Sequence, residues 1–259
     1  NIADTKAIVI DTTAPSVTSF TLSDSSLKSG DTSTVTLVFS EAVDQFSSDD
    51  DITLVNGTMT SMTSDDNITW TGTFTPTTNI TDTSNVLTLS PPWTDTAGNG
   101  GPTATTANFT IDTAAPTVTA FTSTTTNGSY SSDDTINITA TTSEAIVSGN
   151  TLTVTLNTGD GTEPVLLTAA ADGTTLVGTY IIGAGDTSTD LTVTEFSIGA
   201  VTDAAGNAMS STTLPGSNIA DTKAIVIDTT APSVTSFTLS DSSLKSGDTS
   251  TVTLVFSEA

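Results

Sequence analysis

The chain has 259 residues with no Cys and no His, and its 29 acidic side chains face only four lysines, giving a net charge of −25. This charge excludes a basic groove for nucleic acid and disfavours an anionic membrane surface as a partner. No disulfide can form, and the commonest nitrogen ligand and general base is missing. No apolar run reaches the ~20 residues of a membrane span, so we expect no membrane insertion in this segment.

The chain contains an exact duplication. Residues 1–42 and residues 218–259 have the same sequence, which indicates a tandem repeat. A shorter phrase marks smaller units, reading IDTTAP at Ile10–Pro15 and Ile227–Pro232 and IDTAAP at Ile111–Pro116. These phrases lie roughly one hundred residues apart, which is the length of a single β-sandwich domain.

Apolar and polar residues alternate with a period of two along several segments, as in half-buried strands. The inward-facing sets are Val35, Leu37 and Phe39; Ile68, Trp70, Gly72 and Phe74; Leu152, Val154 and Leu156; and Leu176, Gly178 and Tyr180. Asn-Gly or Asp-Gly pairs at 56–57, 160–161 and 172–173 separate such runs and predict two-residue hairpin turns. No window has a helical period.

The alternating pattern also predicts two hydrophobic cores. The first comprises Phe20, Val35, Leu37, Phe39, Trp70, Phe74, Leu87, Leu89, Phe109 and Ile111. The second comprises Phe121, Ile136, Ile138, Leu152, Val154, Leu156, Tyr180, Val193 and Phe196.

Short strands with regular turns favour an all-β protein built from tandem immunoglobulin-like β-sandwich domains in an elongated array. We expect residues 1–11 to be the last strand of a preceding domain, 12–112 a shorter domain, 113–228 a longer domain, and 229–259 the first two strands of the next domain. The end pieces cannot close a sandwich alone. We therefore expect frayed ends or self-association through open strand edges.

Three acidic phrases recur in register: the linker Asp, the Glu of Ser-Glu-Ala, and the Asp and Asn of TDTAGN at Thr94–Asn99 and TDAAGN at Thr202–Asn207. In an immunoglobulin-like sandwich, the linker and the two loops that carry these phrases meet at one pole. The candidate ligands are Asp11, Glu41, Asp95 and Asn99; Asp112, Glu144, Asp203 and Asn207; and Asp228 with Glu258.

Clustered carboxylates repel one another unless a cation lies between them. Calcium takes oxygen ligands, whereas zinc prefers His and Cys, so we expect Ca²⁺ at the domain junctions. Asp31 is a further candidate ligand at the Asp112 junction. The alternative is that each Asp only caps a turn. Because Pro15, Pro116 and Pro232 stiffen the linkers, a shared ion predicts a semi-rigid rod.

The phrases DTTAPSVT, FSEA and TDTAGN resemble those of the bacterial Ig-like extender repeats of giant adhesins, of the repeats-in-toxin and biofilm-associated type. The resemblance covers the whole chain. It implies an extracellular location on the bacterial cell surface, projection of a distal binding domain, and calcium-dependent rigidity. It assigns metal binding to the linker Asp residues, to the Ser-Glu-Ala Glu residues, and to Asp95 and Asp203. The third unit departs from the pattern because no TDxAGN phrase follows Glu258.

We therefore expect a structural extender, or stalk, whose partners are neighbouring Ig-like domains of the same chain. An enzyme is disfavoured, because paired carboxylates of a glycoside hydrolase form one unique site, whereas these acids recur at every junction. The first alternative is a segment of a self-assembling extracellular filament or surface layer. The second is a carbohydrate- or ice-binding repeat that uses Thr-rich faces such as Thr122–Thr126.

Overall fold

The structure is a computed structural model that describes residues 9–159 and 164–258. These residues fall into two compact units. The first comprises the chain up to Thr117 together with Glu144–Val147 and Ala200–Ser211. The second comprises Val118–Ser143, Ser148–Gly199 and the chain from Thr212 on.

The first unit contains a four-stranded antiparallel sheet in the order β1-β3-β7-β6. Its strands are β1 (Val17–Leu22), β3 (Ser33–Phe39), β7 (Thr69–Pro76) and β6 (Gly57–Met59). Residues on β3 alternate between buried and exposed or half-buried positions, as the period of two predicts. This sheet forms one layer of the unit.

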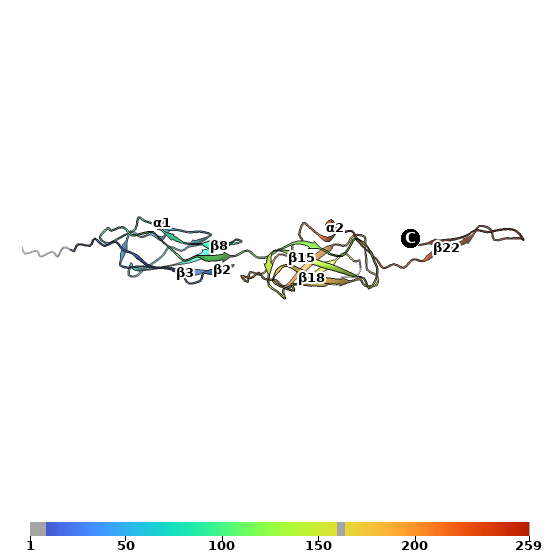
Figure 1. Cartoon of the computed structure of the whole chain (residues 1–259), viewed down its shortest axis with the longest axis horizontal. Coiled ribbons are helices and arrows are strands. Elements are labelled where there is room, and N and C mark those ends of the chain that lie inside the picture. Colours follow the sequence, from blue (N-terminus) through green and yellow to red (C-terminus); the bar gives the residue numbers. More distant parts are fainter. Residues whose placement is uncertain (1–8, 160–163, 259) are drawn as a thin grey trace, which may run out of the picture. The chain divides into compact units, whose positions relative to one another are not determined.

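Shorter strands form the second layer of the first unit, and two of them, β2 and β8, are labelled in Figure 1. They are β2 (Ser26–Lys28), β12 (Phe109–Asp112) and β8 (Thr81–Asn85) in one sheet, β11 (Ala104–Thr105), β9 (Thr88–Leu89) and β5 (Ile52–Thr53) in another, and the pair β10 (Thr94–Asp95) and β4 (Val43–Asp44). A single helical turn, α1 (Ser48–Asp51), precedes β5.

Both layers of the first unit contribute to one core. The rings of Phe74 on β7 and Phe109 on β12 lie 5.5 Å apart between centroids. Every residue of the predicted first core is buried except Trp70, which is half-buried against the cluster. Trp93, which the alternating pattern does not predict, is fully buried beside Phe39.

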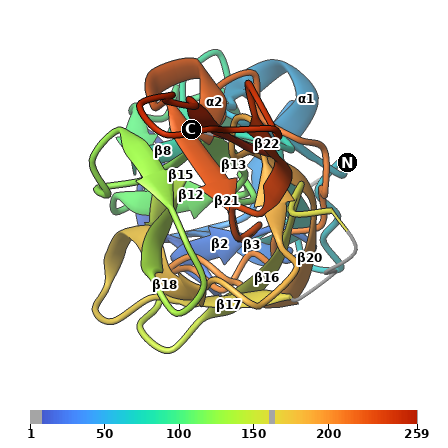
Figure 2. The ribbon, with the colours of Figure 1, turned by 90° about the vertical axis from the view of Figure 1, so that its right-hand side faces the viewer.

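The second unit contains a six-stranded sheet in the order β13-β15-β18-β17-β16-β20 and a three-stranded sheet in the order β14-β21-β19. The first set is β13 (Val118–Thr122), β15 (Thr135–Ile146), β18 (Gly173–Ile181), β17 (Val165–Thr168), β16 (Thr151–Leu156) and β20 (Val193–Ala200). The second set is β14 (Gly128–Tyr130), β21 (Ile225–Asp228) and β19 (Thr187–Ser188), and the short helix α2 (Ile219–Thr222) precedes β21. Strands β16 and β17 lie side by side in Figure 2. All residues of the predicted second core are buried.

The second unit also carries a separate hairpin, β22 (Val234–Leu239) and β23 (Val252–Phe256). Its sequence and its register are those of β1 and β3, down to the same irregularity near the first pair. The burial differs completely: Phe20 is 6% exposed, whereas its counterpart Phe237 is 68% exposed. The same sequence thus forms the same local structure with and without a covering layer.

The predicted turns are only partly as expected. Asn56-Gly57 joins strands of different sheets, because β5 pairs with β9 and β6 with β7, so this pair does not form a two-residue hairpin. Asp172-Gly173 closes the β17–β18 hairpin, but through a longer loop. The pair at 160–161 and most of the predicted strand 1–11 lie outside the described residues, and Val9–Asp11 are not in a strand. After Thr122 the Thr-rich row leaves β13, so it presents no flat strand face.

Candidate cation-binding sites

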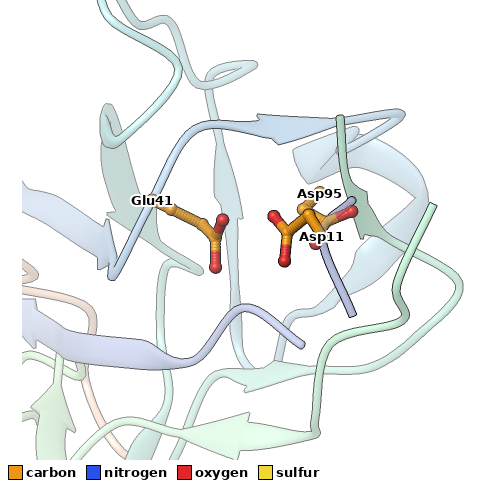
Figure 3. A group of neighbouring side chains, drawn as sticks. All are labelled: Asp11, Glu41 and Asp95. Carbon is orange, nitrogen blue, oxygen red and sulfur yellow. The ribbon is translucent and has the colours of Figure 1, made fainter. Parts of the chain in front are cut away.

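The first acidic group consists of Asp11, Glu41 and Asp95. One carboxylate oxygen from each lies within 4.8 Å of the others. Asp11 precedes β1, Glu41 follows β3 and Asp95 ends β10, so the sandwich brings three distant segments together. In Figure 3 the Glu41 carboxylate points toward those of Asp11 and Asp95.

Asp95 is fixed by its own loop. Its Oδ1 accepts the N–H groups of Ala97 and Asn99, both at 2.8 Å, and its Oδ2 accepts Asn99 Nδ2 at 2.7 Å. Gly98 has φ 90°, which the tight loop requires and other residues rarely adopt. The Asn99 side chain, followed by these backbone donors, holds the pKa of Asp95 below its ordinary value against the opposing effect of desolvation.

The second acidic group consists of Asp112, Glu144 and Asp203, again with one oxygen from each within 4.8 Å of the others. Asp112 ends β12, Glu144 lies on β15, and Asp203 follows β20 and bridges to Ile146. All three residues belong to the first compact unit. The geometry of the first group is thus repeated on different strands.

The loop at Asp203 copies the loop at Asp95. Asp203 Oδ1 accepts Asn207 N–H at 2.8 Å, and Oδ2 accepts Asn207 Nδ2 at 2.8 Å. Gly206 has φ 95°. The phrase TDxAGN therefore encodes one loop. The Asp carboxylate accepts hydrogen bonds from N–H groups of a turn that ends in Gly and Asn.

Burial and the neighbouring carboxylates both affect the pKa of Glu144. Its pKa is raised above the ordinary value by burial first, and then by the negative charges of Asp112 and Asp203. Thr81 Oγ1 donates to Asp112 Oδ1 at 2.9 Å, which offsets part of the charge. A cation held between the three carboxylates would offset the burial cost and the repulsion that raise this pKa.

The donor chemistry fits a hard divalent ion. Every side chain of both groups offers carboxylate oxygen, and the chain has neither His nor Cys to bind zinc. In both groups the Asp from the TDxAGN phrase is buried, at 1% exposed for Asp95 and 2% for Asp203. Buried carboxylates without a paired cation are costly, so both sites suit an ion with oxygen ligands.

The structure places the two asparagines behind the carboxylates. Asn99 and Asn207 each point the side-chain nitrogen toward the neighbouring Asp, and an amide N–H is a donor that cannot coordinate a cation. These contacts make them positioning residues that orient Asp95 and Asp203. The ligand role that the sequence predicts for both asparagines, which would use the side-chain oxygen, stays a prediction.

The third predicted pair is not brought together with other acids in the described part of the chain. Asp228 is exposed, and its Oδ1 accepts Thr230 N–H at 3.0 Å. Glu258 Oε1 is buried without a hydrogen-bond partner there. Asp31 is also outside both groups, and its Oδ2 accepts Lys28 N–H at 3.2 Å.

Fold and site together define an all-β sandwich protein whose acidic pole recurs at successive linkers. Residues 11–111 match the family model of a bacterial Ig-like domain. This match, which ends just before the second linker Asp, supports an Ig-like domain of the kind usually found outside the cell or on its surface. The search of curated proteins found no match. No helix in the described residues is long and apolar enough to cross a membrane.

Proposed function

We propose that the chain is a stalk segment of a bacterial cell-surface adhesin, in which tandem Ig-like domains project a distal binding domain and Ca²⁺ stiffens the junctions. The observation that carries this proposal is the recurrence of one carboxylate triad, with one loop geometry, at two successive linker phrases. Structural ligands recur at each junction of an array, whereas a catalytic site occurs once. Domains of the matched family are typically structural.

Asp11, Glu41 and Asp95 would hold one ion, and Asp112, Glu144 and Asp203 would hold the other. The ion supplies positive charge that offsets repulsion among the three carboxylates. Extracellular calcium modules bind with dissociation constants of about 10⁻⁴–10⁻³ M, so such sites fill outside cells and empty inside them.

The second group explains how an ion would stiffen a junction. Asp112 is the last residue of β12 and is followed by the linker, whereas Glu144 and Asp203 come from β15 and from the loop after β20. An ion held by all three ties the start of the linker to the domain that follows. Pro116 is buried and fixes φ four residues later, so little free rotation would remain.

Small-angle X-ray scattering with and without a chelator tests this proposal. We expect the chelated protein to sample a wider range of sizes than the Ca²⁺-loaded protein, because the junction loses its bridging ion. Asp112→Ala should reproduce the chelated profile in the presence of Ca²⁺, while calorimetry shows both cores still folded.

Asp228→Ala is the matched control, because Asp228 occupies the same linker phrase but joins no acidic group among the described residues. Its scattering should equal that of the parent. Identical profiles for the parent protein with Ca²⁺ and with chelator would defeat the proposal, and unfolding of Asp112→Ala would assign this residue to the core instead.

One observation favours a second function, self-assembly into an extracellular filament or layer. The β22–β23 hairpin exposes Phe237, Leu254 and Phe256, whose counterparts on β1 and β3 are buried. Apolar strand faces of this kind seek a covering surface. Sedimentation velocity tests this alternative, which requires concentration-dependent oligomers that Phe237→Ser abolishes.

A further inference from the structure

The turn that follows β2 has a defined shape. Asp31 N–H donates to Lys28 O at 3.1 Å, and Lys28 N–H donates to Asp31 Oδ2 at 3.2 Å. Gly30 has φ 87°, as the third position of a type II turn requires. Ser29 therefore occupies the second position of the turn, and its backbone N–H takes no part in the hydrogen bonds that form the turn.

This N–H binds the loop of the second acidic group. Ser29 N–H donates to Asn207 Oδ1 at 2.8 Å. The same Asn207 side chain donates through Nδ2 to Asp112 O at 2.9 Å and to Asp203 Oδ2 at 2.8 Å. Asn207 is 4% exposed and joins three segments that all belong to the first compact unit.

Lys28 lies over the same loop. A Cβ atom built on Gly206 would lie 3.2 Å from Lys28 Nζ, so the ammonium group packs against the glycine of the TDAAGN phrase. A positive φ of 95° and this close approach both favour Gly at position 206. The turn thus contacts two adjacent residues of the loop with two different groups.

We infer that Ser29 and Asn207 form a turn-to-loop clasp, a hydrogen-bonded lock that restrains the junction at Asp112 independently of any cation. The inference rests on the proposed function, since it adds a second restraint to the junction that Ca²⁺ stiffens. The segment Ala200–Ser211 continues directly from β20 of the following domain. Holding Asn207 against Ser29 therefore restrains that domain after a chelator has removed the ion.

The turn is a repeated module. In the longer domain Ser131 N–H donates to Asp134 Oδ2 at 2.8 Å, Asp134 N–H donates to Ser131 O at 3.2 Å, and Asp133 has φ 71°. The preceding strand, β14, runs parallel beside β21, as β2 runs parallel beside β12. Both β12 and β21 end at a linker Asp, so each turn stands next to the start of a linker.

Asn99 occupies the same place in the first TDxAGN loop as Asn207 does in the second. Its Nδ2 donates to Asp11 O at 3.3 Å and to Asp95 Oδ2 at 2.7 Å, the same two kinds of acceptor that Asn207 uses. Within residues 9–159 and 164–258, Asn99 Oδ1 accepts no hydrogen bond, and Asn99 is half-buried where Asn207 is buried. The partner that fits Asn99 Oδ1 is the backbone N–H of the residue at the second position of such a turn, supplied by another repeat.

Ser29→Pro tests the clasp, because proline suits the second position of this turn and has no backbone N–H to donate to Asn207. Ser246→Pro is the matched control. Its turn has the same sequence, Asp248 N–H donates to Lys245 O at 3.0 Å, and Gly247 has φ 97°. The chain has no Cys, so a spin-label pair on cysteines introduced at exposed Thr58 and Thr179 reports the distance between the two sandwiches by electron–electron double resonance.

In chelator, we expect Ser29→Pro to raise the fraction of molecules whose spin-label distance lies outside the main peak of the parent. The increase should be roughly two- to tenfold, as the loss of one net hydrogen bond predicts. Asn207→Ala should behave likewise, and Ser246→Pro should match the parent. Equal distributions for Ser29→Pro and the parent in chelator would overturn the clasp. If Ser29→Pro broadens the spin-label distances in chelator and added Ca²⁺ fails to narrow them, the clasp stands and the calcium proposal fails. The two proposals can therefore fail separately.

Discussion

At the scale of single residues, the acidic groups owe their preformed geometry to backbone donors. Asp95 and Asp203 accept N–H groups from their own loops, and a glycine with positive φ closes each loop. These two carboxylates are therefore held in place without an ion, which would reduce the conformational entropy that ion binding must remove. A cation would act on an existing site and would not have to build one.

A close approach between backbone and aromatic ring gives a residue-scale prediction. A Cβ built on Gly101 would overlap the indole ring of Trp93, whereas a Cβ on the adjacent Gly100 meets nothing within 4 Å. We expect Gly101→Ala to destabilise the first unit by about 1–3 kcal/mol through overpacking, and Gly100→Ala to leave stability almost unchanged. Urea unfolding followed by fluorescence of the two tryptophans, Trp70 and Trp93, measures both variants. Equal midpoints would contradict the packing at Trp93.

Asp66 gives a pH-dependent prediction. Thr69 N–H and Ile68 N–H donate to Asp66 Oδ1 at 2.8 and 2.9 Å, and, with the Thr69 N–H as the largest cause, they hold the pKa of Asp66 below its ordinary value of 3.8. The folded state thus favours the ionised form. Its stabilising effect is present above pH 3.8 and is lost as the pH falls through the depressed folded pKa.

Asp66→Ala should therefore lower the urea midpoint of the first unit at about pH 7, and the difference from the parent should shrink toward about pH 3. Asp65→Ala, at the neighbouring exposed carboxylate, controls for the loss of charge alone. A difference that stays constant across this pH range would show that Asp66 acts through something other than its carboxylate.

At the scale of elements, the duplicated hairpin compares one sequence in two environments. β1 and β3 bury Phe20 in the first core, whereas β22 and β23 leave Phe237 exposed. Because two-stranded pieces are marginal in water, burial and not local sequence must decide stability. We expect Phe20→Ala to cost about 3–5 kcal/mol and Phe237→Ala to stay within about 0.5 kcal/mol of the parent.

Calorimetry of the two variants measures this difference, and amide hydrogen exchange followed by NMR locates it. Amides of β1 and β3 should exchange slowly and those of β22 and β23 fast. A Phe237→Ala variant that unfolds as readily as Phe20→Ala would mean that the second hairpin is covered in solution, which favours self-assembly.

Much of this architecture could be predicted from periodicity, because the inward positions of β3, β7 and β16 follow from strict alternation. The convergence of Asp112, Glu144 and Asp203 could be predicted from the fold, although Glu144 lies on β15 and not in the loop after it, where the sequence places it. The Trp93 burial could not, because it lies outside any alternating run. The contact from Ser29 to Asn207 has no sequence signal, since it depends on tertiary packing of residues far apart in the chain.

At the scale of the whole molecule, a charge of −25 opposes compaction, and bound cations would offset part of it. Two carboxylate groups of three members exist among the described residues, and Asp228 belongs to neither. If these groups are the ion sites, the number of Ca²⁺ ions bound per chain should equal the number of acidic groups and not the number of linker phrases.

Equilibrium dialysis at saturating Ca²⁺ should therefore give about two bound ions per chain, one for each acidic group. Asp95→Ala and Asp203→Ala should each remove one ion and leave the other, since the groups share no residue. Asp228→Ala should remove none. At a hundredfold excess of Ca²⁺ over its dissociation constant, each occupied site adds about 2.7 kcal/mol to the stability of the fold that binds it. Loss of both ions in either single variant would mean that the two groups are coupled, and retention of both would mean that the ions bind elsewhere on this acidic surface.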